Sequence, residues 1–336
     1  MTTRRILAAL VAVVLIGAAV LVRATIDDDE SDAPESSTDV TGAPADAGTV
    51  VCASELGAAC AAIDTAFDEL DVIVEPAGTT LDRLAALPDG SEPPLWLTVQ
   101  PYPAMVDSLR TAAALEPLGA TGGAIAATPL VVATPTGGRA DVLQSGCADA
   151  PLWRCIGDSA SAPWTDLGGD AAWRTVRPSL GNVVLEATAL GSFAAAVGGY
   201  FGAPQVSRST WEADTSFIPW LRRLAGAVDP STLSAGTPLA TMVNRPSALD
   251  VGATSAAAVA ALGATAERFD ASYPEPSMWL QAVLAVPGGA SAPGDLATTA
   301  TTALRDAGWD AAAAATQPLP SASTMLALRA LWEEAT

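Results

Sequence analysis

Residues 49–75 read TVVCASELGAACAAIDTAFDELDVIVE, and this stretch decides the fold class. Residues 49–53 and 71–74 are short apolar runs rich in valine and isoleucine, as is typical of buried strands. Between them, apolar residues recur at helical spacing from residue 55 to residue 70. A strand, a helix and a second strand in this order predict a parallel α/β sheet.

The alternation of strands and helices continues along the chain. Further strands are expected at residues 95–99, 129–133, 239–243, 249–253 and 279–286. Further helices are expected at residues 78–87, 102–114, 190–201, 211–227, 255–262, 296–308 and 323–334. In parallel α/β sheets, ligands bind beyond the carboxyl ends of the strands, near helix N-termini. The residues that follow the strands are therefore the candidate site.

Residues 6–22 form an uncharged apolar run of 17 residues, flanked by Arg4-Arg5 and Arg23. This length reaches the lower edge of the roughly 17–25 residues that span a bilayer, and it exceeds the roughly 7–15 of a signal-peptide apolar region. Arg4-Arg5 predicts a cytoplasmic N-terminus. We therefore expect residues 1–25 to be a cytoplasmic stub and a signal anchor, a single-pass transmembrane helix in the cell membrane, with the C-terminal domain extracytoplasmic. A cleaved signal, which would give a secreted protein, and a twin-arginine signal are the alternatives.

Residues 26–48 are rich in Asp, Ser, Pro, Thr and Ala and contain almost nothing apolar to bury. This composition predicts a disordered acidic tether. The run Asp27-Asp28-Asp29-Glu30 is an alternative calcium site. A calcium cage needs ligands at fixed turns, so we favour a solvated acidic run.

The four cysteines form two pairs, each with eight residues of separation: Cys52 and Cys60, then Cys147 and Cys155. An even count in an exported chain predicts disulfides, and three pairings are possible. We expect the two local ones. A four-cysteine zinc site is the alternative, although the spacing lacks the short C-x2-4-C knuckles that zinc sites use.

The basic residues exclude several kinds of chemistry. All 16 are arginine, and the chain has no lysine and no histidine, which rules out a P-loop lysine, a Schiff base, a Ser-His-Asp triad and an H-E-x-x-H zinc site. The 37 acidic residues give a formal net charge of −21, which disfavours nucleic acid. No spacing singles out a carboxylate pair for hydrolysis, and no G-x-S-x-G motif is present. We therefore expect a protein that is not an enzyme and uses no cofactor or metal.

The order of these elements resembles the extracellular solute-binding proteins of the type 2 periplasmic-binding class, and within it the molybdate-binding layout. The resemblance covers about residues 49–315. The matching pieces are VVCASELGAAC, VEPAGTTLDRLAALPDG, PLWLTVQPYPAMVDSL, ATPLVVATPTG, VRPSLGNVVLEATALGSF, ALDVGATSAAAV, ASYPEPSMWLQAVLAV and ALRDAGWD.

The resemblance implies two α/β lobes joined by two crossing strands, with a ligand cleft between the lobes. It places the first crossing at about residues 130–134 and the return near residues 278–286. Lobe one would comprise residues 49–131 and 282–336, and lobe two residues 132–281.

In that class, short polar side chains and backbone N–H groups at loop ends hold the ligand. The corresponding positions in lobe one are Ser54, Thr79, Thr80, Gln100 and Tyr102. Those in lobe two are Ser179, Asn182, Thr254 and Tyr273. Converging hydroxyls and helix N-termini suit a small polar solute, with an oxyanion as one candidate.

Several of these residues also have plainer interpretations. Thr79 and Thr80 are good helix N-caps, and Tyr273 is suited to bracing a proline-rich turn. Three tryptophans between residues 153 and 173 could stack on a planar ligand, although buried packing is the commoner role of tryptophan. Asp250 is either a cleft acid or an ordinary strand-end cap.

Three functional hypotheses follow. The first is a membrane-tethered protein that captures a small polar solute for an ABC-type importer or a sensor. The second is a ligand-free scaffold of the same fold that interacts with an envelope protein. It is motivated by the anchor and by the stretch Gly252-Ala253-Thr254-Ser255, which lacks the aromatic and acidic residues usual in that loop of the class. The third is a carboxylate-based hydrolase, which needs two acids that converge in the cleft.

Overall fold

The computed structural model describes residues 48–228, 236–288, 290–311 and 320–336. Residues 47–336 form one compact unit. The expected anchor at residues 6–22, the remainder of residues 1–25 and all but Gly48 of the expected tether lie outside the described residues.

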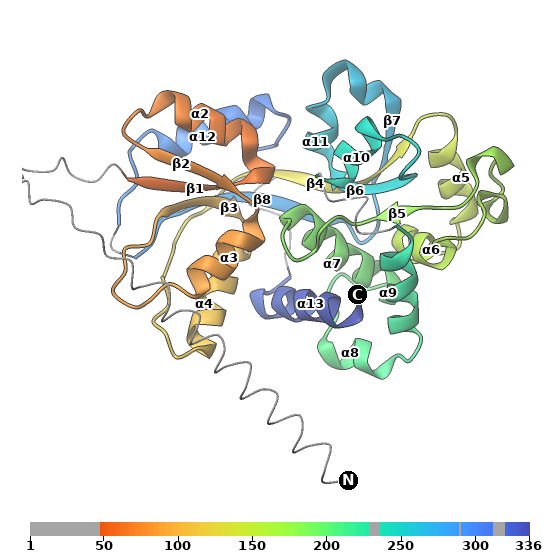
Figure 1. Cartoon of the computed structure of the whole chain (residues 1–336), viewed down its shortest axis with the longest axis horizontal. Helices are drawn as coiled ribbons and strands as arrows, with labels where there is room; N and C mark the ends of the chain where they lie inside the picture. Colours follow the sequence, from red (N-terminus) through yellow and green to blue (C-terminus); the bar gives the residue numbers. More distant parts are fainter. Residues whose placement is uncertain (1–47, 229–235, 289, 312–319) are drawn as a thin grey trace, which may run out of the picture. The chain divides into compact units, whose positions relative to one another are not determined.

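One eight-stranded sheet runs through this unit (Figure 1). Its strand order is β2 (Asp71–Glu75), β1 (Thr49–Ala53), β3 (Leu95–Val99), β8 (Trp279–Ala285), β4 (Ala124–Pro135), β6 (Val251–Ser255) and β5 (Pro178–Ser179), and β7 (Phe269–Ser272) pairs with β4. Strands β1, β2 and β3 are parallel, as are β5 and β6, whereas β8 is antiparallel to β3 and β4. The sheet is therefore mixed, and the expectation of a parallel sheet was wrong at the two strands that connect the lobes.

Strand β4 belongs to both lobes. Its residues 124–129 pair with β8 beside the strands of lobe one, and its residues 130–135 pair with β6 and β7 of lobe two. The chain returns from β7 to β8 across residues 273–278. The lobe boundaries expected at residues 131/132 and 281/282 stay a prediction.

Helices cover both faces of the sheet in lobe one. Helices α2 (Gly57–Ala66) and α12 (Leu296–Asp306) lie on one face, and α3 (Ala77–Ala85) and α4 (Tyr102–Ala112) lie on the other (Figure 1). Strand β3 is buried along its whole length because it is covered on both faces, which explains its continuous apolar sequence.

Lobe two is built from shorter helices around one long one. The long helix α7 (Ala187–Phe201) is buried at nearly every residue. The shorter helices are α5 (Arg139–Gly146), α6 (Leu152–Ser159), α8 (Arg208–Ala213), α9 (Phe217–Gly226), α10 (Pro238–Asn244) and α11 (Ala256–Ala260). The strand expected at residues 239–243 is wrong, because this segment is helix α10. Thr237 caps α10 and Pro238 occupies its first turn.

Helix α13 (Ala322–Ala335) packs against both lobes, although the sequence places it in lobe one. Arg329 of α13 forms a bidentate ion pair with Asp82 of α3 in lobe one, at 2.7 Å for both contacts. Trp332 packs edge-on against Phe193 of α7 in lobe two, with ring centroids 5.1 Å apart. The helix therefore connects the lobes away from the crossing strands.

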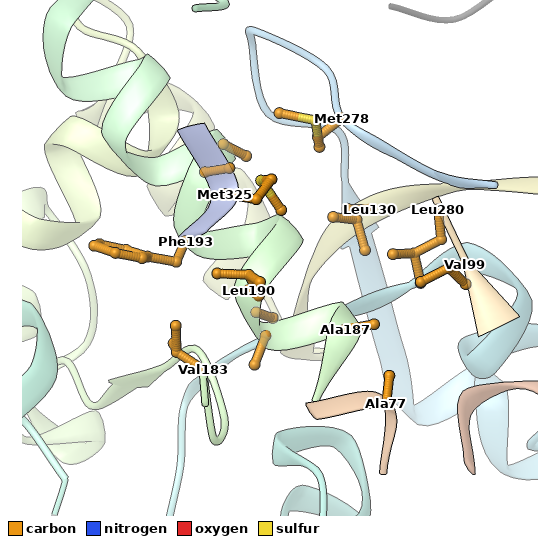
Figure 2. Close-up of a cluster of buried hydrophobic side chains, with 14 of the residues drawn as sticks. Ala77, Val99, Leu130, Val183, Ala187, Leu190, Phe193, Met278, Leu280 and Met325 are labelled. Atoms are coloured by element: carbon orange, nitrogen blue, oxygen red, sulfur yellow. The ribbon is translucent and has the colours of Figure 1, made fainter. Parts of the chain in front are cut away.

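The main hydrophobic core is continuous across the junction of the lobes. Figure 2 shows Ala77 of α3, Leu130 of β4 and Ala187 of α7 in one buried cluster. Burial of such surface contributes roughly 25 cal/mol per Å², so this packing favours lobes in contact.

Both local disulfides are confirmed, since Cys52 is bonded to Cys60 and Cys147 to Cys155. The zinc alternative does not hold, because all four sulfurs are used.

Candidate functional site

A cavity of about 360 Å³ lies between the lobes. Lobe one contributes residues 54–58, where β1 passes into α2, and the C-terminal end of α12. Lobe two contributes the start of α7, α10, the end of β6 and α11. The cavity thus lies at the carboxyl ends of β1 and β6, the place where α/β sheets bind ligands.

Most of the cavity wall is apolar. Seven of the lining residues are alanine, and Leu239, Leu262 and Trp309 add larger apolar surfaces. The polar side chains are the hydroxyls of Ser54, Thr188, Thr237, Thr254 and Ser255 and the carboxyls of Glu55 and Glu186. No arginine is among the described residues that line it. Such a wall suits a small solute with an apolar body and few polar groups.

Two of the hydroxyls cap the N-termini of helices. Thr237 Oγ1 accepts a hydrogen bond from the Ala240 N–H at 3.2 Å, and Ser255 Oγ accepts one from the Ala258 N–H at 3.1 Å. These bonds cap α10 and α11 and fix the two helices that close the cavity from lobe two.

Glu55 connects the two lobes through its side chain. Its Oε1 accepts a hydrogen bond of 2.5 Å from the backbone N–H of Ala187, the first residue of α7. Burial raises the pKa of Glu55, and hydrogen bonds from backbone N–H groups, including those of Ala187 and Thr188, offset part of that shift. A carboxylate of lobe one therefore occupies the positive end of a lobe-two helix.

Glu186 is a second carboxyl beside the same helix end. Burial raises its pKa to about 7, and the negative charge of Glu55 contributes in the same direction. No salt bridge to Glu186 is found among the described residues. The cavity wall therefore holds one carboxyl that accepts a hydrogen bond from a helix N-terminus and another that changes protonation near neutral pH.

On the face of the sheet opposite to α2, α10 and α11, which line the cavity, the lobes touch directly. The Gly78 N–H donates a hydrogen bond of 2.8 Å to the carbonyl of Leu185. A Cβ at position 78 would lie 2.0 Å from the Val184 carbonyl oxygen, so only glycine permits this approach.

Of the nine residues expected at the site, Ser54 and Thr254 line the cavity, one from each lobe. Thr79 is exposed, whereas Thr80 is buried and donates a hydrogen bond of 2.6 Å to Glu75 Oε1. Neither threonine caps α3, because that helix already begins at Ala77.

The structure does not bring Gln100 and Tyr102 into the cavity lining. Gln100 is half-buried, and its backbone N–H donates to the carbonyl of Gln281 at 2.8 Å. Tyr102 is buried against Trp96, and burial, followed by the charge of Glu55, raises its pKa.

The other three expected residues border different cavities. Ser179 and Asn182 line one of about 290 Å³ next to Trp332. Both side chains accept hydrogen bonds from nearby backbone N–H groups, Ser179 from Gly181 and Asn182 from Val184 and Leu185. Tyr273 is 62% exposed and borders a cavity of about 370 Å³ near Cys147.

Asp250 does not line the cavity, and its carboxylate forms ion pairs and does not cap a strand end, whereas the plainer interpretation holds for the tryptophans of lobe two. Asp250 is buried and forms an ion pair with Arg177 at 2.8 Å and with Arg139 at 3.5 Å. Trp153 and Trp164 are fully buried, and Trp173 packs against Trp164 and Arg139.

Sequence reasoning missed the two cavity glutamates. Glu55 directly follows the predicted Ser54, and Glu186 directly precedes α7, so their places at a strand end and a helix start were the available signals.

Comparison with known proteins identifies the fold. A ferric binding protein from Campylobacter jejuni is 8% identical, with a TM-score of 0.53, over 86% of this chain and 99% of that one. A periplasmic binding protein from Actinobacillus pleuropneumoniae, solved with fructose-6-phosphate bound, is 12% identical, with a TM-score of 0.51, over 85% of this chain and 97% of that one. The chain has the fold of the periplasmic solute-binding proteins. No family model matches the chain, and no curated protein matches its sequence.

This binding-protein fold agrees with the resemblance inferred from the sequence, while the molybdate-binding layout stays a prediction. Both compared structures are of binding proteins. In the part of the chain that the structure describes, no helix is long and apolar enough to cross a bilayer. Within the same residues, no group of three or more His, Cys, Asp or Glu side chains could hold a metal ion.

Proposed function

We propose that this protein is a membrane-tethered, extracytoplasmic solute-binding protein that captures a small solute between its lobes. The supporting observation is the cavity of about 360 Å³ at the carboxyl ends of β1 and β6, where both lobes contribute polar side chains to an otherwise apolar wall. The tether at residues 26–48, the anchor at residues 6–22 and delivery to an ABC permease or a sensor are parts of this proposal.

The experiment is a thermal-shift screen of the full chain against anions, sugars, amino acids, small amines and metal ions. A solute that binds only the folded state raises the melting temperature as its concentration rises. We expect one chemical class to do so. In Ala261→Trp, the exposed Ala261 at the end of α11 is replaced by a bulky side chain that obstructs the cavity, so the shift is expected to disappear. If none of these chemical classes raises the melting temperature, solute capture is contradicted.

A ligand-free scaffold is the second candidate, and the direct lobe contacts favour it. The bonds from Gly78 to Leu185 and from Ala187 to Glu55 hold the lobes together through the protein's own groups. Small-angle X-ray scattering distinguishes the two candidates. A solute-binding protein changes its radius of gyration when its solute is added, whereas a scaffold keeps the same radius under every condition of the screen.

A further inference from the structure

The N-terminus of α7 faces the cavity and is not capped by its own segment. Glu186 stands at the N-cap position without a side-chain capping bond, and the first turn of this 15-residue helix holds no acidic residue. The first N–H groups of a helix have no acceptor within the helix, and they attract anions. In this protein the anion comes from the other lobe, as the carboxylate of Glu55.

The contact between Glu55 and the N-terminus of α7 is positioned by the fold at the lobe junction. Glu55 is held at the end of β1 by the 3-10 turn Ser54–Leu56, and its Oε1 lies 2.5 Å from the Ala187 nitrogen. The hydrogen bond lies in a part-buried setting and joins residues 132 positions apart. Glu55 and Thr188 both line the cavity, so the carboxylate fills the place where a bound anion would meet α7.

The rest of the wall adds to this exclusion. A solute anion would lie near the carboxylate of Glu55 and near Glu186, whose pKa of about 7 adds a second negative charge at higher pH, and no arginine among the described lining residues offers compensation. Like charges in a partly buried site repel strongly because the local dielectric constant is low. A cationic or uncharged solute meets no such repulsion.

We propose that Glu55 determines the specificity of the cleft by acting as an internal anion, which excludes oxyanions and restricts the cavity to small uncharged or cationic solutes. This inference rests on the proposed function, because it concerns the same cavity. It differs from a purely structural role of Glu55 in what it predicts: removing the carboxylate creates a binding activity and does not only weaken the fold.

The experiment titrates the full chain with sodium sulfate at constant ionic strength, balanced with sodium chloride, and follows binding by calorimetry and by melting temperature. Wild type is expected to show no sulfate-specific signal. Glu55→Ala frees the Ala187 and Thr188 N–H groups and is expected to bind sulfate at least tenfold more tightly than wild type. Glu69→Ala removes one exposed acid of the same lobe outside the cavity lining, so it is the matched control and is expected to behave as wild type.

A second variant tests the same role of Glu55 in case Glu55→Ala does not fold. Glu55→Gln keeps the size of the side chain and one acceptor oxygen but removes the charge, so a smaller gain in sulfate affinity, about threefold, is expected. Sulfate binding by wild type would overturn the inference. So would the absence of any gain in both variants, or an equal gain in Glu69→Ala.

The outcomes separate this inference from the proposed function. Wild type that binds an oxyanion shifts the screen and thereby supports solute capture, while it refutes the role of Glu55. If no solute shifts wild type but Glu55→Ala gains sulfate binding, the role of Glu55 stands and solute capture fails.

Discussion

The two faces of the sheet at the lobe junction differ in how they use small residues. On the contact face, where α3 meets the start of α7, Gly78 lets two backbones approach to a 2.8 Å hydrogen bond. On the cavity face, between α2, α10 and α11, alanines line a space of about 360 Å³. Small residues therefore bring the lobes together on one face and leave a cavity on the other. Single substitutions can therefore test each face separately.

The largest effect is expected on the contact face from Gly78→Ala. The new Cβ would lie 2.0 Å from the Val184 carbonyl oxygen, which is a backbone atom, so the clash cannot be relieved by moving a flexible side chain. We expect the free energy of unfolding to fall by about 3 kcal/mol and the radius of gyration to rise, as measured by urea denaturation and by X-ray scattering.

Gly57→Ala is the control for that change. Position 57 is the first residue of helix α2, and a Cβ there meets no atom within 4 Å. The helix propensity of alanine should therefore raise the unfolding free energy by up to about 1 kcal/mol. Equal responses at positions 57 and 78 would contradict the contact between the lobes.

A smaller loss is expected where α13 supports the contact face. Trp332→Ala removes the ring that packs on Phe193, and because Trp332 is half-buried we expect a loss of about 2 kcal/mol in urea denaturation. Glu333→Ala, an exposed neighbour on the same helix, should leave stability within about 0.5 kcal/mol. If both variants match wild type, α13 does not hold the lobes together.

Glu186→Gln tests the cavity face through pH. Because the folded-state pKa of Glu186 is raised to about 7, the folded protein binds more protons than the unfolded chain between about pH 4.5 and pH 7. Stability from this group is therefore present at low pH and lost as pH rises through 7. Relative to wild type, Glu186→Gln should gain about 1 to 2 kcal/mol at pH 8 and little at pH 5. A gain that does not depend on pH, in urea denaturation at both values, would contradict this assignment.

The smallest effect on stability is expected from Ala261→Trp. Position 261 is exposed and lies at the end of α11, so the unfolding free energy should stay within about 0.5 kcal/mol of wild type. A larger loss would mean that the cavity has no room for the ring and that the loss of a solute shift in this variant is not specific.

The main strands could be predicted from sequence because burial on two faces leaves continuous apolar runs, as in β1, β3 and β8. Helix α10 could not, since Leu239 to Val243 reads as a buried strand unless Thr237 and Pro238 are recognised as a helix start. The antiparallel arrangement of β8 was also missed, because apolar content carries no information on strand direction.

The site was only partly predictable. Ser54 follows β1 and Thr254 lies near the end of β6, and because these strand ends meet at the cavity, the general rule for α/β sheets placed both residues in its lining. The bond between Glu55 and Ala187 joins residues 132 positions apart, and no local pattern encodes such a partner. Thr80 shows the reverse case, because a hydroxyl in the right segment is used by its neighbour Glu75.

The two disulfides have a consequence for how the chain matures. Each joins cysteines that lie eight positions apart, and no other cysteine lies between the two partners. Of the three possible pairings, the native one forms if each disulfide closes as soon as its second cysteine has been synthesised. Oxidation in order of appearance thus needs no later exchange of partners, and Cys52 has its partner before any part of lobe two exists.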